Sequence, residues 1–274
     1  MNLSKDTLYC RSQLGFGVYQ LKECYEQVYT ALLSGIRLID SAISYRNERE
    51  CERAIQDFCT NHPYVKRDEI TLVTKIPDSL QGFDRTWKAV FQSLRRVDRP
   101  SLDMVLIHSP KWPERRTESW RALVKLKEEG FIQEIGVSNY NIHHLEEIAA
   151  SKLPLPAVNQ IELSTFNSRQ EIQKYCSAHG IALMAFSPLT TGQRLDDNRL
   201  LDLAAKYKRT PSQILLRYCL ERNISPIFKS EKLDHIVENA NCKDFQMNSK
   251  DLAWMATWDE GFISKPSWNP IILP

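Results

Sequence analysis

The sequence lacks long hydrophobic runs and has almost no charge imbalance. No stretch reaches the ~18 apolar residues expected of a membrane-spanning helix, and residues 1–6 contain no apolar signal region. The 36 Lys+Arg and 34 Asp+Glu leave a formal net charge of +2, which gives no electrostatic reason to expect nucleic acid as a partner. We therefore expect a cytoplasmic protein that binds neither a membrane nor nucleic acid.

Paired cysteines are missing as well. The number of cysteines is seven, which is odd, and no C-x-x-C pair occurs. Several lie in apolar stretches of helical spacing, so we interpret them as reduced thiols rather than a disulfide framework. They are Cys10, Cys24, Cys51, Cys59, Cys176, Cys219 and Cys242. Linkers, low-complexity segments and repeats of fixed period are also absent, which favours one domain over residues 1–274.

The sequence does contain a regular alternation of short apolar runs with amphipathic segments, and 42% of its residues are hydrophobic. The apolar runs predict β-strands. They are Leu14–Gln20, Ile36–Asp40, Ile70–Thr74, Leu102–Ile107, Ile132–Val137, Ala157–Ile161, Ile181–Phe186 and Ile224–Phe228. The amphipathic segments predict helices. They are Cys24–Ser34, Glu48–Thr60, Phe83–Val97, Thr117–Glu129, Ile142–Ala150, Arg169–Ala178, Leu200–Tyr207, Ser212–Glu221 and Leu233–Asn239.

Alternating strands and helices predict a parallel sheet, and eight such strands favour a closed (β/α)₈ TIM barrel in the α/β class. The alternative is a doubly wound open sheet, which usually carries G-x-G-x-x-G after its first strand when it binds a dinucleotide. The nearest match is Gly15-Phe16-Gly17-Val18-Tyr19-Gln20, which has no third glycine. Residues 240–274 form an irregular tail with three tryptophans, which we expect to pack over one mouth of the barrel.

Polar side chains stand at the ends of three predicted strands. Asp40 closes the second strand, Lys75 follows the third and His108 follows the fourth, while Tyr45 lies in the loop after Asp40. The carboxyl ends of barrel strands converge on one mouth. A tyrosine becomes a better acid beside a cation, a buried lysine needs a carboxylate partner, and a histidine can orient a carbonyl oxygen. This set is suited to protonating a carbonyl.

Each of these residues also has an ordinary explanation when it is taken alone. Tyr45 can be a surface aromatic, Asp40 and Lys75 can form a partly exposed ion pair, and His108 can be a structural histidine. Their joint placement at strand ends of one barrel favours the catalytic interpretation.

Longer motifs then make the chain similar to the aldo-keto reductase family. The matching stretches run almost the whole length in the same order and spacing. They are Leu14–Gln20, Leu38–Ala42 with Tyr45, Asn47 and Glu48, Thr74-Lys75, Leu106–Pro110, Ile135–Tyr140, Val158–Glu162, Ala185–Leu189 and Lys229-Ser230. The segments after His108 and Phe186 are short, as in a short-loop member resembling aldose or xylose reductases and fungal or bacterial carbonyl reductases.

The resemblance implies a catalytic tetrad of Asp40, Tyr45, Lys75 and His108. In it, Tyr45 is the general acid, Lys75 lowers the pKa of Tyr45, Asp40 pairs with Lys75, and His108 orients the substrate. The family binds a nicotinamide cofactor, usually NADPH, and no metal is expected. The implied cofactor residues are Ser138, Asn139 and Gln160 at the carboxamide, Phe186 on the nicotinamide ring, Ser187 and Leu189 along the pyrophosphate, Lys229, Ser230 and His235 at the ribose phosphate, and Glu238 and Asn239 at adenine. Tyr19 and Trp112 are expected to be pocket walls or caps of the barrel.

Two positions depart from the family pattern. Phe186 stands where tyrosine is common, and stacking needs only the ring face. His235 stands where the family often has arginine, whose fixed charge and bidentate fork a neutral histidine lacks. We therefore expect NADPH with weaker discrimination, so that NADH use is possible.

The function implied is an NADPH-dependent reductase of aldehydes or ketones, of the alcohol dehydrogenase (NADP+) type. The alternative is a cofactor-binding regulatory or channel-associated subunit with little turnover, because a fold does not fix a function. An intact tetrad favours the enzyme. The substrate is a small carbonyl compound that the sequence does not specify further, and we expect a monomer.

Overall fold

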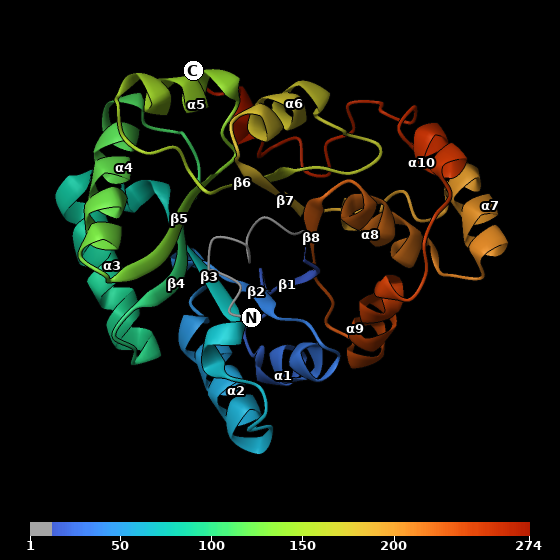
Figure 1. Cartoon of the computed structure of the whole chain (residues 1–274), viewed down its shortest axis with the longest axis horizontal. Coiled ribbons are helices and arrows are strands. Elements are labelled where there is room, and N and C mark those ends of the chain that lie inside the picture. The colour runs from blue at the N-terminus through green and yellow to red at the C-terminus, as the bar shows by residue number, and fades with distance from the viewer. Residues whose placement is uncertain (1–12) are drawn as a thin grey trace, which may run out of the picture.

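Eight parallel strands form a closed barrel in the computed structural model, which describes residues 13–274. The predicted barrel is therefore confirmed, and Figure 1 shows its strands surrounded by helices. Cys10 and residues 1–6 lie outside the described residues. The strands are β1 (Gly15–Gly17), β2 (Leu38–Asp40), β3 (Thr71–Ile76), β4 (Leu102–Ile107), β5 (Ile132–Ser138), β6 (Val158–Glu162), β7 (Ala182–Phe186) and β8 (Ile224–Phe228).

Helices follow the strands in the order that the sequence predicts. The α-helices are α1 (Tyr25–Leu33), α2 (Glu48–Asn61), α3 (Phe83–Val97), α4 (Pro113–Glu128), α5 (Ile142–Ala150), α6 (Gln170–Ala178), α7 (Asn198–Tyr207), α8 (Pro211–Glu221), α9 (Leu233–Ala240) and α10 (Ser249–Met255). Short 3-10 turns are η2 (Ile43–Tyr45), η3 (Arg67–Glu69), η4 (Asp78–Leu80), η5 (Thr190–Gly192), η6 (Asn241–Lys243) and η7 (Pro270–Ile272). Within residues 13–274, none of the helices is both long and apolar enough to cross a membrane.

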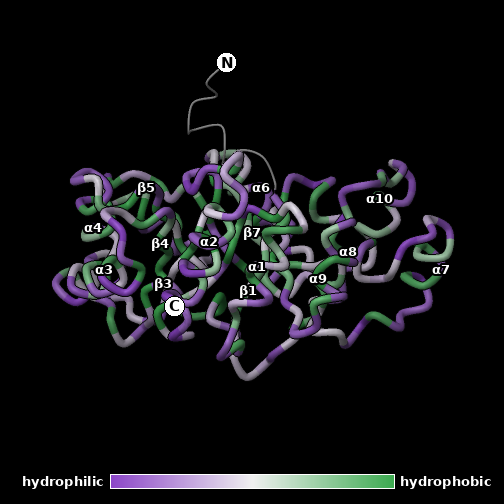
Figure 2. Tube along the Cα trace, turned by 90° about the horizontal axis from the view of Figure 1, so that it is seen from below, coloured by the Kyte–Doolittle hydropathy of each residue, from purple (hydrophilic) through white to green (hydrophobic). Residues whose placement is uncertain are grey.

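Two layers of apolar side chains hold the barrel together. Figure 2 shows hydrophobic residues along the central strands and more hydrophilic ones along the outer helices and loops. The inner layer fills the barrel itself. It consists of Leu38, Val73, Met104, Leu106, Val158, Met184 and Ile227. The outer layer lies between strands and helices and includes Phe16, Ile39, Val105 and Ile161. Successive strand residues therefore face the two layers in turn, as the twofold side-chain period of a strand requires.

A glycine permits close contact between two strands on the inner face. A Cβ atom on Gly136 would lie 2.7 Å from the carbonyl oxygen of Val158 and 2.7 Å from a Leu106 methyl group. A backbone oxygen cannot swing aside as a flexible side chain can. Only glycine therefore allows β5 to approach β6 this closely.

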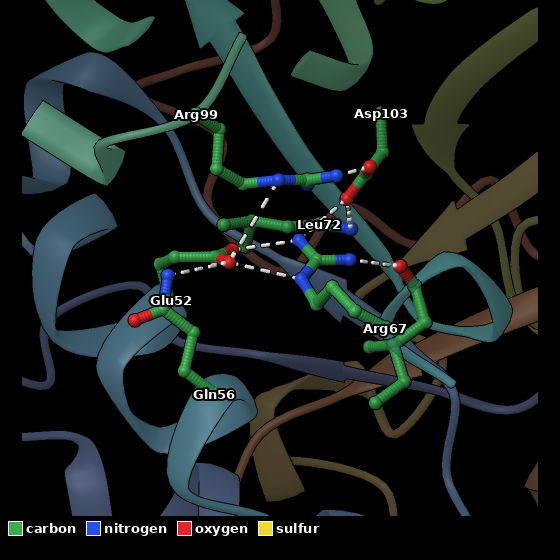
Figure 3. Close-up of polar contacts among 7 residues, drawn as sticks. Glu52, Gln56, Arg67, Leu72, Arg99 and Asp103 are labelled. Carbon is green, nitrogen blue, oxygen red and sulfur yellow. Dashed lines mark hydrogen bonds and ion pairs between the residues drawn. The ribbon is translucent and has the colours of Figure 1, made fainter. Parts of the chain in front are cut away.

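The amino-terminal ends of β3 and β4 carry a buried charge network, drawn in Figure 3. Arg67 donates to Glu52 at 2.6 Å and to Asp103 at 2.8 Å, and Arg99 donates to Asp103 at 2.7 Å. Asp103 also accepts from the backbone N–H of Leu72 at 2.9 Å. A neighbouring cavity of about 10 Å³ has room for about one water molecule. This end of a TIM barrel usually serves stability rather than catalysis.

The tail contains structure that the sequence analysis did not predict. Residues 240–274 were expected to be irregular, yet α10 lies within them. Its start is capped by Asn248, whose side-chain oxygen accepts from the N–H of Asp251 at 2.9 Å. The tail then runs from α10 to the neighbourhood of α5, where the chain ends in Figure 1.

Candidate active site

The strand register explains why the predicted site residues face the barrel mouth. Five of them lie two positions beyond an inner-layer residue and therefore on the same face of its strand. The pairs are Leu38 with Asp40, Val73 with Lys75, Leu106 with His108, Val158 with Gln160, and Met184 with Phe186. Because side chains alternate between the two faces of a strand, the five polar or aromatic residues all point to the inside of the barrel. They therefore form one cluster at the carboxyl ends of the strands.

Asp40 and Lys75 form an ion pair inside this mouth. The Lys75 Nζ lies 2.7 Å from both carboxylate oxygens of Asp40, and the two side chains are only 1% and 7% exposed. The third N–H of the ammonium reaches the carbonyl oxygen of Ser41 at 2.9 Å. Burial lowers the pKa of Lys75, and the Asp40 charge opposes that shift. The pair is therefore fully hydrogen-bonded on its lysine side.

Tyr45 ends the turn η2 directly above this ion pair. The centre of its ring lies 5.3 Å from the Lys75 Nζ and 5.1 Å from the ring of Tyr19. Burial, with the nearby Asp40 charge, raises the pKa of Tyr45 well above 10.0. The family resemblance implies that Lys75 lowers this pKa, which stays a prediction. In this structure desolvation outweighs any such lowering, because the three ammonium N–H groups are directed at Asp40 and Ser41.

His108 completes the cluster from the end of β4. Its ring lies 5.9 Å from the Tyr45 ring, edge to face. Burial, assisted by the Lys75 charge, lowers the pKa of His108 to about 3. The imidazole is therefore neutral at physiological pH and keeps one N–H to donate.

Two residues support this cluster, and the sequence analysis gave them no role. Asn47 donates to the carbonyl oxygens of Val18 and Leu21 at 3.0 and 2.9 Å and accepts from the Ser41 hydroxyl at 2.7 Å. The Glu48 carboxylate accepts hydrogen bonds from the hydroxyls of Thr74 and Ser93 and forms an ion pair with Arg96. The Asn47 contacts tie the loop of Tyr19 to that of Tyr45. Both residues belong to the family-like motif after Asp40, which was the available signal.

A polar network joins the ends of β5 and β6 to the ion pair. The Gln160 amide donates to Asp40 at 2.8 Å, and the Ser138 hydroxyl donates to the carbonyl oxygen of Gln160 at 2.9 Å. Asn139 donates to the Ser138 hydroxyl and to the His108 carbonyl oxygen, both at 3.0 Å. Within residues 13–274, no group donates to the side-chain oxygen of Gln160 or Asn139. These oxygens can therefore accept hydrogen bonds from a ligand amide.

An aromatic side chain ends β7, and the chain turns directly after it. Phe186 is half-buried, and its ring lies 6.1 Å from the Trp268 ring of the tail. Ser187 takes a left-handed backbone conformation with φ of 50°, and Leu189 follows it, half-buried.

The residues predicted to meet the cofactor's adenosine end lie further out, after β8 and on α9. Lys229, Ser230, His235 and Glu238 are partly or fully exposed. Lys229 lies 3.5 Å from Glu231. Asn239 is instead 5% exposed, and its side-chain oxygen is buried without a partner among the described residues.

The predicted pocket aromatics differ in their relation to the cluster. Tyr19 is 46% exposed and contacts the Tyr45 ring. Trp112 is 37% exposed and stacks with Lys111 and Arg115 instead. The sequence analysis missed Trp268, which lies 6.1 Å from the His108 ring. The position of Trp268 depends on how the tail folds over the barrel, which the local sequence pattern does not predict.

Comparisons with known proteins agree with this architecture. The model of the Aldo/keto reductase family matches residues 12–260. An oxidoreductase of Schizosaccharomyces pombe is 64% identical over 96% of each chain. Glyoxal reductase of Bacillus subtilis is 37% identical over 87% of this chain and 85% of the relative. The crystal structure of a Bombyx mori aldo-keto reductase in complex with NADP has a TM-score of 0.84 at 28% identity and covers 92% of this chain and 90% of that one.

Proposed function

Because the chain belongs to the aldo/keto reductase family and is an oxidoreductase, we propose that it reduces aldehydes or ketones with NADPH and that Tyr45 donates the proton. The observation that carries this proposal is the cluster at the strand ends, in which Tyr45 lies against the Asp40–Lys75 ion pair and His108. The alternative of a non-catalytic subunit gains no support from relatives such as glyoxal reductase of Bacillus subtilis, which is named for a reductase activity.

The residues at the mouth fit a nicotinamide cofactor. The side-chain oxygens of Asn139 and Gln160 and the Ser138 hydroxyl are placed to bind a carboxamide, and Phe186 offers a ring face for stacking. Glu238 and the unpartnered side-chain oxygen of Asn239 would accept hydrogen bonds from adenine, with the buried Asn239 oxygen becoming accessible on binding. Lys229, Ser230 and His235 would meet the ribose phosphate, and Ser187 and Leu189 the pyrophosphate. When bound, NADPH supplies the hydride.

The tetrad supplies the proton and the orientation. Burial keeps Tyr45 protonated, so its hydroxyl is available as a donor over the physiological pH range. The neutral His108 donates its N–H to the carbonyl oxygen and aligns that oxygen with the Tyr45 hydroxyl. As the proton moves to the oxygen, the Lys75 ammonium stabilises the phenolate that remains. Asp40 keeps Lys75 charged and fixed.

The proposal also covers the setting of this activity. We place the enzyme in the cytoplasm as a monomer of one domain over residues 1–274, with residues 240–274 over the barrel mouth. Its substrate is a small carbonyl compound, with Tyr19 and Trp112 as pocket walls. No nucleic acid or membrane partner is part of the proposal.

Tyr45→Phe tests the proposal, because it removes one hydroxyl and keeps the ring. We expect NADPH consumption with an activated aromatic aldehyde, a dicarbonyl and an aldopentose to fall by at least about 100-fold. NADPH binding, followed by protein fluorescence, should persist. Wild-type protein that binds NADPH but turns over none of these carbonyls would contradict the proposed function.

A further inference from the structure

The tail is held at two points, one on each side of residues 265–269 in the sequence. On one side, the N–H of Ser264 donates to Glu162 at 2.6 Å, and Gln193 donates to the Ser264 carbonyl oxygen at 3.0 Å. On the other side, Ile271 is 3% exposed, and a ring nitrogen of His143 lies 3.1 Å from the Leu273 carbonyl oxygen. Residues 265–269 span the interval between these anchors.

Trp268 lies in that interval and faces the cluster. Its ring is 6.1 Å from His108 and 6.1 Å from Phe186. Its side chain is nevertheless 40% exposed. Contacts within the span, which include the hydrogen bond from the Trp268 backbone N–H to the Lys265 carbonyl oxygen, therefore cover Trp268 only in part.

Arg116 is a buried charged member of the second anchor. It lies on α4, is 4% exposed and pairs with Glu147, with Nε to Oε2 at 2.7 Å. One terminal nitrogen of the guanidinium donates both to the Pro110 carbonyl oxygen at 2.9 Å and to the Pro274 carbonyl oxygen at 2.6 Å. Pro110 is two residues beyond His108. Arg116 thus joins the loop after a catalytic strand to the end of the tail.

A planar guanidinium is suited to this task. Its five N–H groups lie in a fixed fork, so one side chain can hold a carboxylate and two carbonyl oxygens together. The lysine ammonium has three donors on one atom and cannot reach the same groups at once. Replacement by lysine keeps the charge and removes the bridging geometry.

We propose that Arg116 is a positioning residue that fixes Trp268 as the outer wall of the carbonyl pocket and thereby favours aromatic over two-carbon substrates. The inference rests on the proposed function. An aromatic aldehyde is large enough to pack against Trp268, whereas glyoxal is held by the catalytic cluster alone. Loss of this wall should weaken the binding of an aromatic aldehyde and leave the binding of glyoxal unchanged.

Hydrogen exchange tests the anchoring without any turnover. In Arg116→Lys, amides of residues 265–274 should exchange at least about tenfold faster than in wild type, while the barrel strands stay unchanged. Arg121→Lys is the matched control, because Arg121 lies on the same helix, its side chain is 53% exposed and, among residues 13–274, it pairs only with Glu118. Equal exchange of the tail in both variants would overturn the proposal.

Kinetics test the consequence for specificity. We expect Arg116→Lys to raise the KM for 4-nitrobenzaldehyde about fivefold to tenfold, the value of a lost aromatic contact, with little change in kcat or in the KM for glyoxal. Trp268→Ala should do the same, and the double variant should add nothing further. Additive effects, or an equal rise for glyoxal, would show that Arg116 acts only on general stability.

A second variant covers the case in which Arg116→Lys folds poorly. His143→Ala removes an exposed anchor to Leu273, and it should change the same amides and the same KM in the same direction by a smaller factor. If the amides of residues 265–274 exchange in His143→Ala as they do in wild type, the second anchor does not hold the tail. If the wild type reduces no carbonyl, the proposed function fails, whereas the exchange experiment still decides whether Arg116 holds the tail.

Discussion

At the scale of single residues, burial controls the charges at the barrel mouth. Lys75 keeps a buried charge because Asp40 accepts two of its N–H groups, while His108 is neutral and Tyr45 stays protonated. The sequence could place these residues at strand ends, but it could not show that the Lys75 donors were already occupied. The direction of the Tyr45 shift therefore needed the structure.

Removal of the buried cation should be costly. Lys75→Met leaves the Asp40 carboxylate without its counterion at 7% exposure, so the free energy of unfolding in urea should fall by about 3–5 kcal/mol. Lys127→Met is the control, since Lys127 is 41% exposed in its pair with Glu134 and should cost less than about 1 kcal/mol. Equal losses would mean that the Asp40–Lys75 pair is not isolated from solvent.

His235 provides a residue-scale test of cofactor preference. His235→Arg adds a fixed charge and a fork on the exposed start of α9, so it should tighten NADPH binding about tenfold and leave NADH nearly unchanged. Fluorescence titration measures both dissociation constants. His179→Arg, an exposed change at the end of α6, should alter neither. If both affinities stay unchanged in His235→Arg, the residue does not face the ribose phosphate.

At the scale of elements, the sequence predicted the order and type of the barrel elements but not all their bounds. The first strand was expected over Leu14–Gln20 and pairs only over Gly15–Gly17, because the chain turns after Val18 to meet Asn47. The helix expected from Thr117 begins at Pro113, a favourable first helical position. The hydrophobic periodicity predicts which face of an element is buried. The ends of β1 and α4 depend instead on capping and on contacts with residues distant in sequence.

Asn47 allows an element-scale test of the link between two active-site loops. Asn47→Asp keeps the shape but turns an acceptor toward the carbonyl oxygens of Val18 and Leu21. We expect a loss of about 1–3 kcal/mol in unfolding free energy and a lower kcat.

The matched control for this change is Asn141→Asp. Asn141 caps α5 with its side-chain oxygen, which accepts from Ile142 at 2.8 Å, and aspartate caps equally well. Chemical denaturation measures the unfolding free energy of both variants, and a turnover assay measures their kcat. Equal stability of the two would show that the Asn47 amide donors are not needed.

At the scale of the whole molecule, two histidines make stability depend on pH. The pKa of His108 is lowered to about 3 and that of His144 to about 4, both chiefly by burial. The unfolded chain therefore takes up these protons first, near the ordinary value of 6.5. Their contribution to stability is complete above pH 6.5 and is lost as pH falls toward 4.

We expect the unfolding free energy to fall by up to about 1.4 kcal/mol per pH unit for each histidine in this window. His144 accepts the N–H of Asn141 at 2.9 Å, and protonation would break that bond. His144→Gln should flatten the urea-denaturation profile between pH 6.5 and 4, whereas His179→Gln, on the exposed surface, should leave the slope unchanged. A wild-type profile that is flat over this range would contradict the assignment.

The tail is the part of the molecule that sequence patterns reported least. Its anchor joins Arg116 to Pro274, 158 positions apart, and no local spacing encodes such a contact. The same limit explains why Trp268 was missed while His108 and Phe186 were found.

The closure of the barrel has a consequence for how the chain is made. β1 pairs with β8, so that Gly15 lies beside Ile227. During synthesis the first strand therefore leaves the ribosome long before its second neighbour exists. Contacts this distant in sequence form slowly, and until β8 emerges β1 exposes an unpaired edge of the kind that recruits foreign strands. The nascent chain should accordingly need the most protection from chaperones after β7 has emerged and before β8 does, when all but one strand of the ring is present.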